Sequence, residues 1–154
     1  MSRPVPICTI VFVAITLAPG LTLHQRGSLW RYVALTPPDT IWLGASFPLE
    51  RLADRINDST YQLRPQTFGG AERIRLFTSA NGHVRAIDFQ YEAGAQFNQM
   101  RADYASILGP PTGVDSTAKR RSAFWQDKRT RFELLSWHVG ELEFVAARMS
   151  DISR

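Results

Sequence analysis

The sequence predicts an α+β domain that follows an N-terminal apolar segment. Apolar residues recur at helical spacing in two stretches and alternate with polar residues in several others. Turn signals separate the alternating stretches. We expect the domain to span residues 28–150 and to contain two similar halves, about 41–91 and 95–149. Each half is expected to be a helix followed by an antiparallel meander, and the two units are expected to pack as one small domain.

The N-terminal segment predicts where the protein works. Residues 5–23 carry no charged side chain and follow Arg3 and the free amino terminus. An apolar core that ends in small residues is typical of an export signal. We expect a signal peptide of residues 1–20, with the mature chain starting near Leu21. Two alternatives stay open: an uncleaved membrane anchor to about residue 23, since a bilayer requires about 20 apolar residues, and a buried element of the fold.

Composition excludes several classes of function. The chain has 154 residues and a formal net charge of +4, and 16 of its 18 basic residues are arginine. So small a net charge does not by itself indicate nucleic-acid binding. Cys8 is the only cysteine and would leave with the signal peptide. The mature chain could then hold no disulfide, no thiol nucleophile and no cysteine-based zinc site.

One short strand is expected before the first half, which itself is expected to begin with another short strand and a helix. Alternation predicts a strand over residues 30–35, and an apolar run predicts another over 41–43. Ser46 is typical of a helix cap, and Pro48 suits the first turn. The residues that follow at helical spacing are Leu49, Leu52, Ala53 and Ile56. We therefore expect a helix that begins after Ser46 and ends at Asn57.

A hairpin is expected to complete the first half. A short strand is predicted around residues 61–63, followed by a polar loop. Residues 73–78 and 84–91 both alternate and flank Asn81-Gly82. Because Asn-Gly is the preferred pair for a two-residue hairpin turn, these segments are predicted to pair as antiparallel strands.

The second half is expected to repeat this plan. Apolar residues on one face predict a helix over residues 95–108. Gly109 suits the residue after its end, and Pro110-Pro111 prevents its continuation. Three antiparallel strands are then expected after a polar loop, over residues 123–125, 130–137 and 142–149.

Short motifs in this arrangement resemble those of small exported bacterial modules. Three motifs carry the resemblance: Ile41-x-Leu43-Gly44, Leu108-Gly109-x-Pro111, and Trp125-x-Asp127-x-x-Thr130 followed by alternating Phe132 and Leu134. Residues 41–149 thus resemble the β-lactamase-inhibitor-protein-like fold, which is similar to the outer-membrane assembly lipoprotein of the SmpA/BamE type. The chain lacks the lipidated cysteine of that lipoprotein and the disulfides of the inhibitor. The resemblance implies an exported adaptor or binding module and carries over no catalytic residue.

The residues that could carry chemistry form no recognisable motif in the sequence. His24, His83 and His138 lack the spacing of metal ligands. Ser46 lies in Gly44-Ala45-Ser46-Phe47-Pro48, which lacks the final glycine of a nucleophile elbow. We therefore expect no cofactor, no metal site and no catalytic residue.

A basic cluster is the candidate binding surface in the sequence. Its members lie within 13 residues and include one tryptophan: Lys119, Arg120, Arg121, Trp125, Lys128, Arg129 and Arg131. Residues 119–121 precede a predicted strand and residues 128–129 occupy the far tip of its hairpin, so the cations need not form one patch. A solvated loop is the more common meaning of such a charge run. Trp125 and Trp137 are interpreted as core or interface anchors, since their strands are already rich in Phe and Leu.

These observations predict an exported, periplasmic, non-enzymatic binding or adaptor module of the bacterial cell envelope. Its expected partner is another envelope protein, contacted through a sheet face or loops, rather than a nucleic acid. Residues 5–23 are the segment through which membrane contact is expected. Two alternatives stay open: an envelope structural component anchored in the inner membrane, and a small periplasmic hydrolase. The hydrolase would be favoured if Asp88, His83 or His138 met in a deep pocket.

Overall fold

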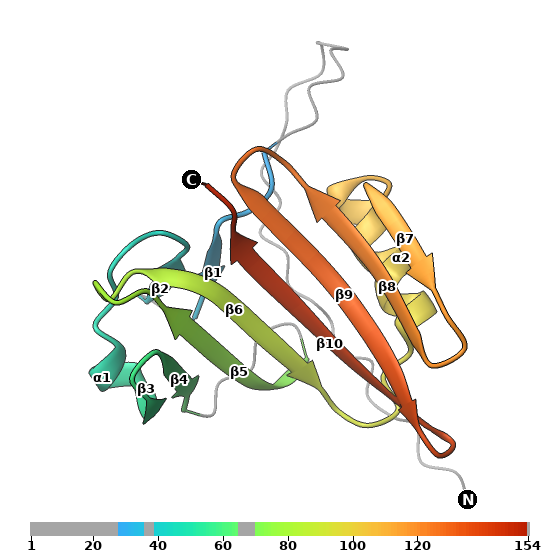
Figure 1. Ribbon diagram of the computed structural model, residues 1–154, viewed down its shortest axis with the longest axis horizontal. Helices are drawn as coiled ribbons and strands as arrows, with labels where there is room; N and C mark the ends of the chain where they lie inside the picture. Colours follow the sequence, from blue (N-terminus) through green and yellow to red (C-terminus); the bar gives the residue numbers. More distant parts are fainter. Residues whose placement is uncertain (1–27, 36–38, 65–69, 154) are drawn as a thin grey trace, which may run out of the picture.

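The molecule is mostly β. The computed structural model describes residues 28–35, 39–64 and 70–153. Strands make up 54% of the described structure and helices 14%. The prediction of an α+β domain built from two helix-plus-meander units is therefore wrong. Among the described residues, one eight-stranded antiparallel sheet dominates, accompanied by two helices and a two-stranded ribbon (Figure 1).

The first predicted helix accounts for much of this error. α1 (Leu49–Leu52) is a single turn, and the chain continues directly as strand β3 (Ala53–Asn57). Pro48 precedes the turn without a side-chain cap, and Ser46 forms an isolated β-bridge instead of a cap. Ile56 is exposed on β3 rather than part of a helical face. Four apolar residues at helical spacing did not outweigh pairing with β4, because helices this short gain little stability by themselves.

The sheet is built from two groups of four consecutive strands. The first group continues from β3 through β4 (Thr60–Leu63), β5 (Ala71–Thr78) and β6 (Val84–Tyr91). The second consists of β7 (Gly113–Ser116), β8 (Arg120–Gln126), β9 (Thr130–Val139) and β10 (Leu142–Asp151). The strand order is β3-β4-β5-β6-β10-β9-β8-β7, so the groups join where β6 pairs with β10.

Several local predictions are confirmed. β5 and β6 form the expected hairpin, but the predicted two-residue turn is wrong: the Gly82 N–H donates to the Ser79 carbonyl over 2.9 Å, so Ala80 and Asn81 are the central residues of the turn. Gly82 follows them with φ +77°, a conformation that favours glycine. The second helix, α2 (Phe97–Leu108), ends at Gly109, which has φ +80°. The predicted polar loop after it contains the unexpected edge strand β7.

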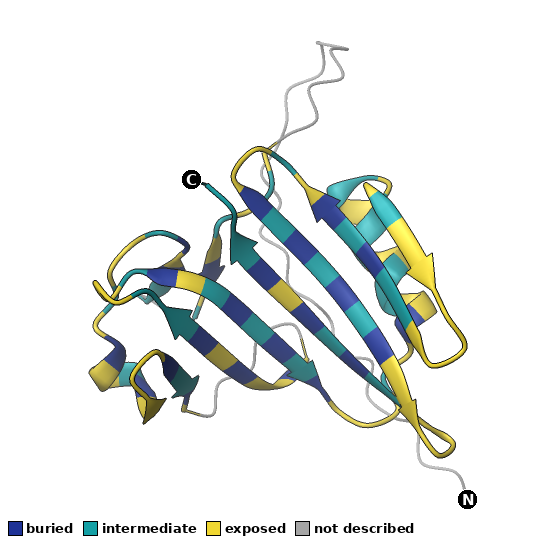
Figure 2. Ribbon diagram, in the orientation of Figure 1, coloured by how far each residue is buried: buried dark blue, intermediate teal, exposed yellow. Residues whose placement is uncertain are grey.

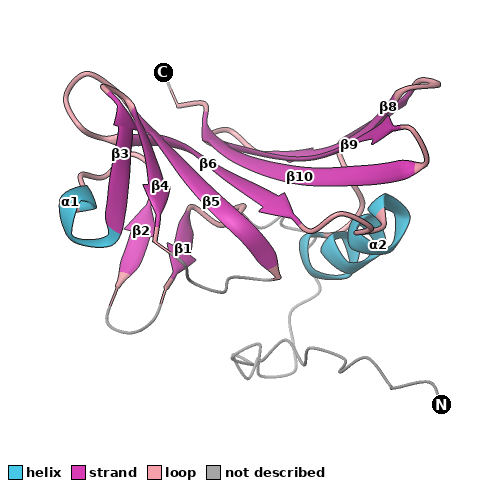
Figure 3. Ribbon diagram, turned by 90° about the horizontal axis from the view of Figure 1, so that it is seen from below, coloured by secondary structure: helices cyan, strands magenta, loops and turns pink. Residues whose placement is uncertain are grey.

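The core lies on one face of the sheet, here called the inner face. α2 and the ribbon of β1 (Tyr32–Ala34) and β2 (Thr40–Trp42) lie on this side (Figure 3). Val33 and Ile41 pair across the ribbon and are buried in the core. Buried and less buried residues alternate along the central strands (Figure 2). This period of two is what a sheet with one covered face requires.

The side chains of Trp125 and Asp127 hold loops of the second half in place through hydrogen bonds. The Trp125 indole N–H donates to the Gly109 carbonyl over 2.8 Å and so ties β8 to the end of α2. The Asp127 carboxylate accepts the backbone N–H groups of Leu29, Arg129 and Thr130, each at 2.7 Å. Burial disfavours the charged Asp127, but these donors and the nearby positive charge of an arginine outweigh it and lower its pKa. Asp127 therefore fixes the β8–β9 turn and the chain that enters β1.

Gly113 is expected to be intolerant of substitution because it lies beneath an aromatic ring. It pairs with Phe124, and a Cβ at Gly113 would lie 2.4 Å from one atom of that ring. The Arg131 guanidinium lies 4.0 Å from the Phe124 ring centroid and restricts its movement. We expect Gly113→Ala to lower the free energy of unfolding by about 1–2 kcal/mol, because overpacking forces such groups apart. Urea denaturation measures this loss.

A double-mutant cycle controls that prediction. In a Phe124→Ala background the ring is absent, so Gly113→Ala should cost almost nothing beyond Phe124→Ala alone. An equal cost of Gly113→Ala in both backgrounds would show that the ring contact is not the cause.

Candidate binding surface

No described helix or strand covers the face of the sheet opposite α2. We call it the outer face (Figure 3). Residues paired across antiparallel strands share a face, so the registers define its members. One row crosses the sheet through Arg75, Asp88, Arg148, Glu133 and Phe124. A second row contains Phe144, Trp137 and Arg120.

An apolar patch occupies one end of the outer face. It comprises the outward side chains of the β9–β10 hairpin, here called the hairpin patch: Leu135, Trp137, Val139, Leu142 and Phe144. Trp137, Val139 and Leu142 are 37%, 61% and 55% exposed. The Trp137 and Phe144 rings lie 5.9 Å apart with planes inclined by 17°. At this distance nearly parallel rings overlap in an offset stack, so they form an apolar ridge.

The hairpin patch is exposed because β9 and β10 extend beyond one neighbour. β10 pairs with β6 only from Ala146 to Ser150. Residues 142–145 therefore pair with β9 but not with β6, and among the described residues the Glu143 carbonyl accepts only the Gly94 N–H on that side, over 3.3 Å. β8 pairs with β9 as far as Trp137, leaving Val139 without a partner in β8. The hairpin tip thus projects from the sheet, as Figure 1 shows.

The acidic side chains on the central strands of the outer face are neutralised by arginines. Arg148 donates to both Asp88 oxygens, at 2.5 and 2.8 Å, and its guanidinium lies 5.0 Å from the Phe77 ring centroid. The hydrogen bonds to Asp88 raise the pKa of Arg148 although partial burial opposes this. Arg131 lies 3.4 Å from Glu133. Both carboxylates of these strands are therefore already paired.

Three arginines of the outer face are left without a counter-ion. Within the described residues, Arg73, Arg75 and Arg120 form no ion pair. Arg120 lies directly opposite Trp137 and so borders the hairpin patch. Arg73 and Arg75 lie on β5, on the other half of the sheet. The outer face of the described structure therefore combines an apolar ridge with three unpaired arginines, against one unpaired carboxylate on the edge strand β7, Asp115.

The basic cluster predicted from the sequence is divided by the fold. Trp125 is buried in the core. Lys119 precedes β8, and Lys128 and Arg129 follow it. The seven residues of β8 separate the two groups, by about 20 Å at the usual rise of a strand. Of the predicted residues, Arg120 and Arg131 share the outer face, and Arg121 points to the inner face.

Arg121 belongs to a partly buried polar cluster beside the start of α2. It pairs with Glu143, and its guanidinium lies 5.0 Å from the Phe97 ring centroid. Burial disfavours the charged Glu143. The nearby Ser136 hydroxyl, the Arg121 guanidinium and the Phe97 backbone N–H outweigh burial and lower the pKa of Glu143. The Glu143 carboxylate accepts the Phe97 N–H at the N-terminus of α2, where no residue of the helix itself provides a side-chain cap. Arg121 therefore has a structural role.

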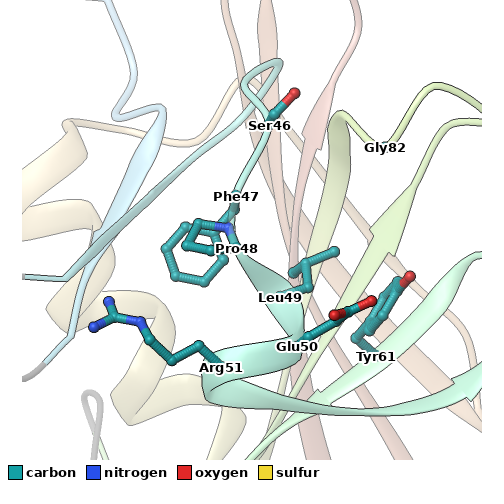
Figure 4. Close-up of a pocket in the computed structure, with 8 residues that line it drawn as sticks. All are labelled: Ser46, Phe47, Pro48, Leu49, Glu50, Arg51, Tyr61 and Gly82. Carbon is teal, nitrogen blue, oxygen red and sulfur yellow. The ribbon is translucent and has the colours of Figure 1, made fainter.

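A hollow lies beside α1. It has a volume of about 500 Å³ and is lined by Ser46, Phe47, Pro48, Leu49, Glu50, Arg51, Tyr61 and Gly82 (Figure 4). Glu50 and Tyr61 project to one side, whereas Arg51 projects away and pairs with Asp39. The hollow contains no histidine, so no general base of that kind lines it.

The residues whose convergence would favour a hydrolase lie apart in the described structure. Asp88 is paired with Arg148 on the outer face. His83 lies just before β6, at the end of the sheet where β6 pairs with the last residues of β10. His138 pairs with Glu143 at the opposite end of β10. No group of three or more histidine, cysteine or acidic residues that could hold a metal occurs in the described part of the chain.

The hairpin patch was not among the residues predicted to bind a partner. A signal was nevertheless present in the sequence. Leu134-Leu135 and Phe144-Val145 are neighbouring apolar pairs on adjacent strands, and neighbouring residues of a strand point to opposite faces. Leu134 and Val145 are buried on the inner face, so Leu135 and Phe144 lie on the outer one. Adjacent apolar residues at the end of a hairpin thus indicated apolar surface on both faces.

The chain was compared with protein-family models, curated proteins and solved structures. None of them matches it. Among the described residues, no helix has the length and apolar character needed to span a membrane.

Proposed function

We propose that the chain is an exported, non-enzymatic protein-binding module of the bacterial cell envelope that contacts its partner through the hairpin patch. The observation that carries the proposal is the clustering of Trp137, Val139 and Leu142 on an uncovered sheet face. Scattered exposed apolar residues are ordinary, but a contiguous group with polar surroundings marks an interaction site. Tryptophan is among the residues that contribute most to binding energy at protein interfaces.

The charges around the hairpin patch favour a partner with carboxylates. Arg120 borders Trp137, and Arg73 and Arg75 add positive charge farther along the outer face. An acidic protein surface would complement these arginines and be steered towards them. A second copy of the chain is disfavoured, since two outer faces meeting about a two-fold axis would bring like charges together.

The location in the cell envelope rests on the sequence of the N-terminal segment. Residues 5–23 have the layout of an export signal, and an exported chain would meet its partner in the periplasm. Retention of this segment would make the same module an anchored component of the inner membrane. The proposed surface is the same in both cases.

Loss of the exposed aliphatic side chains is expected to abolish partner retention without unfolding the chain. Val139→Ser/Leu142→Ser removes two residues that are more than half exposed, so the free energy of unfolding should change by less than about 1 kcal/mol. Retention of the partner from an envelope extract by the immobilised chain should fall at least about tenfold, as expected for central interface residues. Quantitative mass spectrometry of the retained proteins measures this change.

Ile107→Ser is the matched control for that experiment. Ile107 is 41% exposed on α2, away from the outer face. This variant should retain the partner like the wild type, and raising the salt concentration should weaken retention because arginines contribute. Equal retention by the hairpin and control variants would contradict the proposed surface.

A further inference from the structure

A second aromatic cluster lies on the side of the molecule away from the outer face. It is formed by Trp30, Tyr32 and Trp42, here called the ribbon cluster, which are 37%, 42% and 51% exposed. Tyr32 and Trp42 pair across β1 and β2, and their ring centroids are 4.8 Å apart. The ribbon lies behind the sheet in Figure 1 and on the side of α2 in Figure 3.

The ribbon cluster is exposed although the ribbon itself is firmly attached. The face with Val33 and Ile41 is buried against the inner face of the sheet. Backbone bonds join Gly44 N–H to the Val84 carbonyl at 2.7 Å and Val84 N–H to the Ala45 carbonyl at 3.0 Å. The three aromatic rings are therefore carried by a segment that is held firmly against the sheet. They have no covering element in the described structure and are not needed to close the core.

The composition of the ribbon cluster differs from that of the hairpin patch. Its large members are only tryptophan and tyrosine, and the other outward residues of the ribbon are Ala34 and Thr40. The adjacent Arg31 turns inward, where its guanidinium lies 3.1 Å from Asp151. Exposed tryptophan and tyrosine are typical of surfaces at the membrane–water boundary. There the ring lies in the apolar region while the N–H or O–H group meets water and headgroups.

The position of the ribbon in the chain points to the same partner. The apolar run of residues 5–23 ends seven residues before Trp30. Seven residues span at most about 25 Å, so a bilayer that holds the apolar run is within reach of the ribbon cluster.

We propose that the ribbon cluster seats the protein on a lipid bilayer, with Trp30, Tyr32 and Trp42 in the interfacial layer. The outer face would then point away from the bilayer and present the hairpin patch to a partner. This surface is independent of the proposed protein-binding surface, because the two lie on opposite sides of the sheet. It also differs from anchoring by residues 5–23, which requires no contact between the folded domain and lipid.

Quenching by brominated lipids tests this proposal on the full chain. The probe is a vesicle of phosphatidylethanolamine and phosphatidylglycerol whose acyl chains are brominated near the headgroups, so that tryptophans in the interfacial layer lose fluorescence. We expect quenching in the wild type and loss of that quenching in Trp30→Phe/Trp42→Phe. Trp137→Phe, which removes the tryptophan of the outer face, should keep the quenching. The single variants Trp30→Phe and Trp42→Phe should each lose part of the quenching. Every substitution is to phenylalanine, so that an aromatic ring remains and packing is preserved.

Three outcomes would overturn the proposal. An anchored chain whose ribbon stays in water would be recovered with the vesicles but show no quenching. Quenching that survives in Trp30→Phe/Trp42→Phe would place another part of the molecule at the bilayer. A dimer in solution that dissociates in the double variant, without quenching on vesicles, would assign the ribbon cluster to contact between copies. None of these outcomes affects retention of a protein partner by the hairpin patch.

Discussion

Trp125→Ala is expected to lower the free energy of unfolding by about 3–5 kcal/mol, as for other large aromatic residues in protein cores. Trp125 is buried, with its ring 5.8 Å from Phe132 and 6.2 Å from Tyr104, measured between centroids. The substitution leaves a cavity between α2 and the sheet and removes the hydrogen bond to the Gly109 carbonyl. Since a domain has a total stability of roughly 5–15 kcal/mol, much of the population should unfold at moderate urea concentrations.

A comparison of two tryptophans makes this prediction specific. Trp137→Ala removes the same side chain from the outer face, where no core forms, and should cost no more than about 2 kcal/mol. Urea denaturation followed by circular dichroism measures both variants. Trp125→Phe separates the contribution of core packing from that of the hydrogen bond. It keeps most of the side-chain volume but leaves the Gly109 carbonyl without its donor. Equal costs for Trp125→Ala and Trp137→Ala would contradict the assignment of Trp125 to the core.

Asp151→Asn is expected to lower the free energy of unfolding by about 2–4 kcal/mol at neutral pH, because removing one member of a buried ion pair leaves the other uncompensated. The Asp151 side chain is 2% exposed and lies 3.1 Å from Arg31 and 3.4 Å from Arg85. Arg31 also donates to the Arg129 carbonyl and the Thr130 hydroxyl, so this pair fastens the ribbon to the sheet.

The same carboxylate predicts a dependence of stability on pH. Burial disfavours the charged Asp151, but bonds from Ser153 and the nearby Arg31 outweigh it and lower its pKa. A lowered pKa in the folded state contributes stability that is full above the ordinary aspartate pKa, about 3.9. This contribution is lost as the pH falls through the lower folded value. The wild type should therefore lose stability below about pH 4 more steeply than Asp151→Asn.

Asp58→Asn is the control for both measurements. Asp58 is fully exposed and pairs with Arg55 on the surface. Surface pairs of this kind contribute little, so this variant should follow the wild-type pH curve. Parallel curves for the wild type and Asp151→Asn below pH 4 would contradict the role of Asp151.

Sequence signals that depend on a few neighbouring residues predicted the β5–β6 hairpin and the end of α2. Asn81-Gly82 predicted the hairpin but not its loop, in which Ala80 and Asn81 are the central residues of the turn and Gly82 follows with positive φ. Gly109 marked the end of α2 because glycine readily takes up a conformation with positive φ. These features depend on a few adjacent residues, and such residues can be read from the sequence.

Features that depend on distant pairing could not be read in this way. The β6–β10 ladder joins the two groups of strands, and Asp88 and Arg148 within it are 60 residues apart. Residues 53–57 became β3 because β4 was available to pair with them, although their spacing also fitted a helix. The candidate site failed for the same reason. The basic residues were close in sequence, whereas the strands of the hairpin decided which face each side chain took.

Photo-crosslinking in the producing cell tests the hairpin patch most directly. Benzoylphenylalanine is introduced in the full chain at Val139 or Leu142, and at Ile107 as the exposed control. We expect both hairpin positions to form an adduct of one defined mass with the same protein, and Ile107 to form none. Absence of an adduct at both hairpin positions, or the same adduct at Ile107, would contradict the claim that this patch binds a protein partner.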